Sequence, residues 1–300
     1  MDLLRDNVRA VYRKYFLAAF GSALISCIYG VVDMAMVGQY QGPDGTAALA
    51  VVAPVWNVIY SLGLLTGIGG SVLLSAKRGS GAAGQAEANE YFTTAVLASV
   101  LLAALAWAGI WLLEKPILRF FGADALAIYG PVINISTFVQ CCAYSVGQAA
   151  QPIIPTNFGA HQGARIRAVL RLALVSCVAF SVFWTALSLA WPNLYIRIFM
   201  RPTAAILTMA PGIVRTYAVS FLLLPLNIFS TYYFQAILKP DAAFFVSVAW
   251  GLVISGALIL LLPAVLGPTS IWWAMPVAEL LVACYAVTAM RRATRALPPC

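Results

Sequence analysis

Long apolar segments recur along this chain of 300 residues, and they restrict its fold more than any other feature. A helix needs about 20 apolar residues to cross the ~30 Å hydrocarbon core of a bilayer. The segments lack sustained alternation of polar and apolar residues, so they indicate helices rather than strands. We expect eight membrane-spanning helices, at about 15–38, 47–76, 91–113, 132–158, 168–191, 210–238, 243–263 and 268–290.

The composition agrees with burial in lipid. Apolar residues make up 62% of the chain and charged residues 9%, against about 45–50% and about 25% in an average globular protein. A water-soluble protein of this length has too much surface for its volume to hide so many apolar side chains. The sequence therefore predicts an all-α polytopic membrane protein whose main partner is the lipid bilayer.

The net charge of +8 is distributed unevenly over the expected loops. If the amino terminus is cytoplasmic, 13 of the 18 basic residues lie on the cytoplasmic side. The positive-inside rule then places both termini in the cytoplasm of a plasma or inner membrane, as eight spans require. Anionic lipid headgroups are the expected partners of this charge, and nucleic acid is not.

Several motifs of soluble enzymes are missing from the sequence. It has no G-x-x-x-x-G-K-[ST] loop, no G-x-S-x-G and no H-E-x-x-H. His161 is the only histidine, and no cysteine spacing is typical of a metal site. We expect no enzyme activity, no cofactor and no metal site, and we interpret the cysteines as small apolar residues.

An internal repeat is visible in two glycine-containing stretches. GIGGSVLLSAKRGSGAAGQAEA begins at Gly67, and GQAAQPIIPTNFGAHQGARIRA begins at Gly147. In each copy a glycine follows twelve positions later, at Gly79 and Gly159, and another apolar span comes after it. Both copies run in the same direction across the expected membrane, which is typical of two-lobed transporters.

Asp33 is the most informative residue, because it lies inside the first expected span. A carboxylate at membrane depth costs several kcal/mol unless it is protonated, paired or facing water. Burial makes such a group able to exchange a proton near neutral pH. The alternative is a carboxylate near the end of the span that reaches interfacial water.

Glu279 is the other acidic residue well inside an expected span, three residues after Pro276. It is a candidate for an ion or cation site, and equally for a buried hydrogen-bonded carboxyl that holds helices together.

Uncharged amide side chains also fall within the expected spans, where they either bridge helices or line an aqueous cavity. Gln148 and Gln151 lie beside Pro152 and Pro155, a combination that suits a kinked helix facing a cavity. Our candidates for an ion or substrate path, besides the two acids, are Asn57, Gln148, Gln151, Asn157, Asn227 and Gln235.

Five segments resemble the multidrug and toxic compound extrusion (MATE) family, in the same order along the chain. They read VDMAMVGQYQG from Val32, GIGGSVLLSAKRGSGAAGQAEAN, GQAAQPIIPTNFGAHQGARIRAVL, YYFQAILKPDAAFFVS and GPTSIWWAMPVAELL. The resemblance implies a bundle related to the family's two lobes of six helices each. It also implies export of organic cations or drugs in exchange for protons or sodium, with Asp33 matching the acid of the family's first helix.

The chain departs from the family in length. Its first three expected spans resemble helices one to three, and its last five resemble helices eight to twelve. The counterpart of helices four to seven is missing, so we divide the chain into remnants of the two lobes at 1–131 and 132–300. A chain of this kind would have to form a homodimer to enclose a path.

Three functions are compatible with the resemblance. The first is an antiporter for organic cations coupled to H⁺ through Asp33. Sodium coupling is the weaker alternative, because span 210–238 carries no acidic residue. The others are a flippase of the same superfamily for lipid-linked substrates or polysaccharides, and a remnant without transport activity that survives as a fragment or a partner subunit.

Overall fold

The computed structural model describes residues 3–79, 90, 93–94, 96–105, 108 and 123–297. In this part of the chain all regular structure is helical, with no strand. The chain forms two compact units. Unit 1 consists of Met1–Gly42 and Pro131–Cys300, and unit 2 of Pro43–Gly130.

Helix α1 runs over Val8–Gly79 and is interrupted once, at Gly42. Gly42 has φ 66° and ψ −145°, a conformation open to glycine because it lacks a Cβ. The interruption separates the expected spans 15–38 and 47–76. The expected span 91–113 is helical over 96–105 and otherwise lies mostly outside the described residues.

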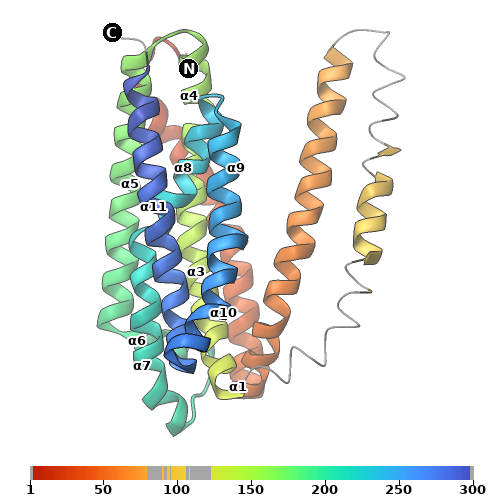
Figure 1. Ribbon diagram of the computed structural model, residues 1–300, viewed down its shortest axis with the longest axis vertical. Helices are drawn as coiled ribbons and strands as arrows, with labels where there is room; N and C mark the ends of the chain where they lie inside the picture. Colours follow the sequence, from red (N-terminus) through yellow and green to blue (C-terminus); the bar gives the residue numbers. More distant parts are fainter. Residues whose placement is uncertain are drawn as a thin grey trace. The chain divides into compact units, whose positions relative to one another are not determined.

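The other long elements belong mainly to unit 1, where α5, α8, α9 and α11 run side by side (Figure 1). The helix bounds are α3 Ala123–Ala150, α4 Ile153–Gly159, α5 Gly163–Ala190, α6 Pro192–Phe199, α7 Ala204–Ala218, α8 Leu224–Ala236, α9 Pro240–Val248, α10 Ile254–Leu266 and α11 Ala274–Arg295. Short 3₁₀ segments occupy Val219–Leu222 (η2) and Pro268–Trp273 (η4), and a π-helical turn, η3, occupies Ala249–Val253.

The expected spans are more broken than the sequence pattern indicates. Within span 132–158, helix α3 ends at Ala150 and α4 begins at Ile153. Pro152 lies at this break, because proline lacks the backbone N–H that would continue the helix. Span 210–238 is divided by η2 between α7 and α8. The π turn interrupts span 243–263, and such turns often mark functional or strained places in helices.

Four helical stretches of the described residues are long and apolar enough to cross a membrane. They are Val8–Thr46, Gly163–Ala190, Ala204–Ala236 and Thr269–Arg295. Large apolar side chains such as Val175, Leu260 and Leu281 are at least half exposed, as lipid-facing residues are. Spans 132–158 and 243–263 are not among these stretches, and α10, for example, has 13 residues. Span 47–76 lies largely on residues whose side chains fall outside what the structure describes, and span 91–113 does so in part.

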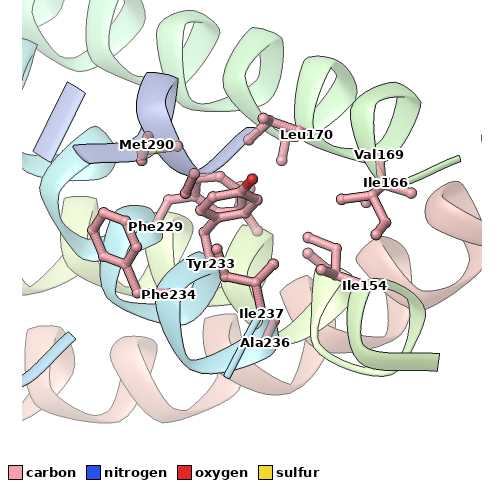
Figure 2. Close-up of a cluster of buried hydrophobic side chains, with 14 of the residues drawn as sticks. Ile154, Ile166, Val169, Leu170, Phe229, Tyr233, Phe234, Ala236, Ile237 and Met290 are labelled. Atoms are coloured by element: carbon pink, nitrogen blue, oxygen red, sulfur yellow. The ribbon is translucent and has the colours of Figure 1, made fainter. Parts of the chain in front are cut away.

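A core of buried apolar side chains in unit 1 lies where α4, α5, α8 and α11 meet. Phe229, Tyr233 and Phe234 of α8 are fully buried there, against Ile166 and Leu170 of α5 (Figure 2). These aromatic side chains make α8 the central helix of the unit.

Two cysteines have a role that the sequence interpretation missed. Cys27 of α1 and Cys141 of α3 form a disulfide with 6.9 Å between their Cα atoms. Interpreting them as small apolar residues was therefore wrong for this pair. Nothing local indicates the pairing, because the two residues are 114 positions apart.

Candidate functional site

Three of the candidate glutamines line one cavity of unit 1. Gln148, Gln151 and Gln235 surround a cavity of about 470 Å³, together with Pro152 and Pro155. All three glutamine side chains are exposed. Amides at such a place can exchange hydrogen bonds with water or with a polar solute, because each has both donors and acceptors.

The local sequence explains why this cavity exists. Pro152 stops α3 at Ala150, and the backbone N–H of Gln151 still donates to the carbonyl of Gly147, at 3.0 Å. Thr156 donates its hydroxyl to the Pro152 carbonyl at 2.8 Å. The broken helix thus turns its glutamines toward α8, which contributes Gln235.

Gly147 lets α3 and α8 approach each other closely beside the cavity. A Cβ at this position would lie 2.5 Å from two ring atoms of Tyr232. The ring of Tyr232 also packs edge-on against Tyr144, with 6.3 Å between the ring centroids. The glycine that begins the second repeat copy is therefore a packing requirement.

Glu279 lies at the centre of a buried polar cluster. Its side chain is 0% exposed. Asn227 of α8 donates its amide to carboxylate Oε2 at 2.5 Å and to the Glu279 backbone carbonyl at 2.9 Å. Trp250 of η3 donates its indole N–H to Oε1 at 2.8 Å. One carboxylate therefore joins α8, η3 and α11.

The side-chain oxygen of Asn227 is a further hydrogen-bond acceptor in this cluster. Its Oδ1 is buried and has no partner among the residues that the structure describes. The candidates Glu279 and Asn227 are thus in direct contact, whereas neither lines the glutamine cavity.

Asn157 is fully buried in a separate cluster that fastens the amino-terminal segment. Its amide donates to the carbonyls of Ile153, at 2.8 Å, and Leu3, at 3.2 Å. Its Oδ1 accepts from Arg165 Nε at 3.0 Å. Arg165 also donates to the carbonyls of Leu3 and Asp6, at 3.0 and 2.7 Å.

Asp33 lies on an exposed face of α1 within unit 1. No hydrogen bond or ion pair joins its carboxylate to another residue of the described part of the chain. Tyr29, Met36 and Tyr40 are 78%, 69% and 89% exposed. Their spacing from Asp33 places all four residues on one side of the helix, with Tyr29 about one turn before the carboxylate and Tyr40 about two turns after it.

The remaining candidate, Asn57, is part of α1, and its side chain lies outside what the structure describes. The structure adds two residues that sequence reasoning missed, Trp250 and Arg165. Both are fixed by contacts with distant residues. Their only signal in the sequence is a donor side chain within or next to an expected span.

Apolar helices of membrane-spanning length, lipid-facing apolar side chains and buried polar clusters define a polytopic α-helical membrane protein. A family model described as MatE matches residues 18–125 and, a second time, residues 121–259. The chain belongs to the MatE family. This result confirms the family that the five sequence segments indicated.

Two solved structures are similar to this chain. One is a ligand complex of the MATE multidrug transporter DinF-BH, with a TM-score of 0.68 and 16% identity, over 97% of this chain and 98% of that chain. The other is the outward-facing conformation of a multidrug resistance MATE family transporter of the MOP superfamily. Its TM-score is 0.55 and its identity 14%, over 97% of this chain and 93% of that chain. At such identities the likeness shows the fold alone, and a comparison with curated proteins found no match.

Proposed function

We propose that this chain is a secondary-active antiporter that exports organic cations or drugs across the cytoplasmic membrane. Asp33 couples export to the entry of H⁺. The observation that carries the proposal is the exposed face of α1, where one carboxylate stands between Tyr29 and Tyr40. Family membership supports the transport class.

The chemistry of this face suits competition between a proton and an organic cation. A carboxylate attracts a cation, and tyrosine rings attract it further through their π faces. Tyr29 and Tyr40 are eleven positions apart, which spans about 16 Å along a helix and brackets a drug-sized molecule. Protonation of Asp33 removes the negative charge, so a proton and the cation exclude each other at this site.

The glutamine cavity supplies a second binding place for the exported cation. Gln148, Gln151 and Gln235 offer hydrogen bonds to a solute, and no charged residue of the described part of the chain lines the cavity. A cation is therefore held there only weakly and can leave, as transport requires. We assign Glu279 to structure instead, because both carboxylate oxygens are occupied by donors and its side chain is 0% exposed.

The test is efflux of a fluorescent organic cation from drug-sensitive cells that express the chain. We expect Asp33→Asn to abolish efflux while expression and membrane insertion stay unchanged. The matched control is Asp241→Asn, which neutralises an exposed aspartate in the first turn of α9 and should leave efflux intact. In proteoliposomes, a pH gradient should drive uptake, whereas a sodium gradient should not.

Any of three results contradicts the proposal. Normal efflux by Asp33→Asn would remove Asp33 from the mechanism, and a sodium-driven signal would replace the proton as coupling ion. Absence of efflux from well-inserted wild-type protein would favour the remnant or the flippase.

A further inference from the structure

A second cavity of unit 1 lies between α5 and α11 and has a volume of about 480 Å³. Helix α8 packs against both α5 and α11 and contributes Leu226 to the lining. We call this cavity the arginine groove. Among the described residues it shares no lining side chain with the glutamine cavity, and none of its residues takes part in the proposed coupling.

The arginine groove carries positive charge at one end. Arg167 of α5 and Arg291 and Arg295 of α11 line it, and no acidic residue does within the ranges that the structure describes. Arg291 and Arg295 are one helical turn apart, so they project from the same side of α11. Guanidinium groups pair with phosphate through two parallel hydrogen bonds, which makes arginine the preferred partner of phosphate oxygens.

The rest of the groove is apolar. Leu170 and Leu174 of α5 line it one turn apart, and Leu226 and Val287 face them from α8 and α11. Val287 precedes Arg295 by eight residues, which corresponds to about 12 Å along a helix. The charged end and the apolar end are thus separated by the distance between a lipid phosphate and the upper part of an acyl chain.

One hydrogen bond joins two of the helices that form the arginine groove. The hydroxyl groups of Tyr233 and Thr294 are 2.8 Å apart, which joins α8 to α11. Tyr233 is fully buried, and its hydroxyl points away from the α8 backbone toward α5 and α11 (Figure 2). The groove is therefore formed before any ligand binds, which lowers the entropic cost of binding.

We propose that the arginine groove binds one anionic phospholipid, with its phosphate on Arg167, Arg291 and Arg295 and an acyl chain along Leu174, Leu226 and Val287. Charge complementarity selects an anionic headgroup, and the apolar lining selects a lipid over a soluble phosphate. The inference does not depend on transport activity, because it concerns a surface of unit 1 alone.

Binding can be measured by native mass spectrometry of the purified full chain in detergent. The probes are dioleoyl phosphatidylglycerol, dioleoyl phosphatidylcholine and glycerol phosphate. We expect phosphatidylglycerol to bind more tightly than phosphatidylcholine, and glycerol phosphate not to compete at millimolar concentration. Replacing the three arginines by glutamine should weaken phosphatidylglycerol binding by about fivefold for each arginine removed.

The matched control replaces Arg171 and Arg292 by glutamine. Both are exposed arginines of α5 and α11 that do not line the groove, so binding should stay unchanged. If the triple variant does not fold, Leu174→Trp serves instead, because it fills the apolar end and leaves the arginines in place. It should also weaken binding.

Three results would overturn the inference. Equal losses in the groove variant and the control would indicate unselective surface charge. Equal affinity for the two phospholipids would remove the role of the arginines. Effective competition by glycerol phosphate would identify a site for soluble phosphate rather than for lipid.

Discussion

The environments of Asp33 and Glu279 in the structure differ sharply. Both are single acids in apolar segments, and the sequence made both candidates for ion coupling. In the structure Asp33 is exposed within its unit, whereas Glu279 is 0% exposed and accepts from Asn227 and Trp250. Sequence alone does not separate the two, because the side of a helix that a residue occupies has meaning only once the neighbouring helices are known.

At the residue scale we predict that Glu279→Ala destabilises the protein. The substitution leaves the Trp250 indole N–H without its acceptor and leaves the Asn227 amide only the backbone carbonyl of residue 279, at a cost of about 1–3 kcal/mol. Thermal unfolding in detergent, followed by a thiol-reactive or intrinsic fluorescence signal, measures the loss.

Glu279→Gln is the control for this prediction. Glutamine still accepts from Trp250 through its oxygen, and after an amide flip Asn227 Oδ1 can accept from its NH₂ group. We therefore expect a smaller loss than for alanine, with efflux retained. An alanine variant as stable as the wild type would contradict the clustering of these three helices.

At the scale of elements, the contact between α3 and α8 shapes the glutamine cavity. Gly147 removes a side chain at the point where Tyr232 of α8 crosses α3. The sequence repeat drew attention to Gly147 but not to its partner, because the two residues belong to different expected spans. The cavity itself was anticipated in part, from Gln148 and Gln151 beside two prolines.

We predict that Gly147→Ala costs about 1–3 kcal/mol, because the added methyl group overpacks the contact with Tyr232. The double variant Gly147→Ala/Tyr232→Ala lacks the ring that the added methyl group would overpack. Its loss of stability should therefore be smaller than the sum of the losses in the two single variants. A double-mutant cycle of unfolding temperatures tests this coupling.

Gly212→Ala provides the matched control. Gly212 lies inside α7, and no atom of the described part of the chain stands within 4 Å of a Cβ built there. Alanine favours helix over glycine, so this variant should be neutral or slightly more stable. A Gly147→Ala variant that behaves like Gly212→Ala would show that α3 and α8 can separate without cost.

At the scale of the whole molecule, the MatE model matches two successive stretches, 18–125 and 121–259. The family pattern therefore occurs twice in the chain, as the glycine repeat suggested. Our division into remnants at 1–131 and 132–300 remains a prediction, as does the loss of the counterparts of helices four to seven. Helix α3, from Ala123 to Ala150, runs continuously across the division between residues 131 and 132.

We predict that the chain works as a homodimer, because eight expected spans provide fewer helices than the twelve that the family resemblance implies for a complete path. Mass photometry or native mass spectrometry in lipid nanodiscs should give the mass of two chains. A monomeric preparation that transports an organic cation would contradict this prediction.

The sequence by itself determined that the chain is helical, embedded in a membrane and a member of the MatE family. These properties follow from composition, from the lengths of apolar runs and from short local motifs, and each is contained in consecutive residues. Only the tertiary structure decided that Glu279 meets Asn227, 52 positions away, that Cys27 meets Cys141, and that three arginines line one groove. Such contacts depend on which helices pack together and on the direction in which each side chain projects, and neither is encoded in the local pattern of the chain.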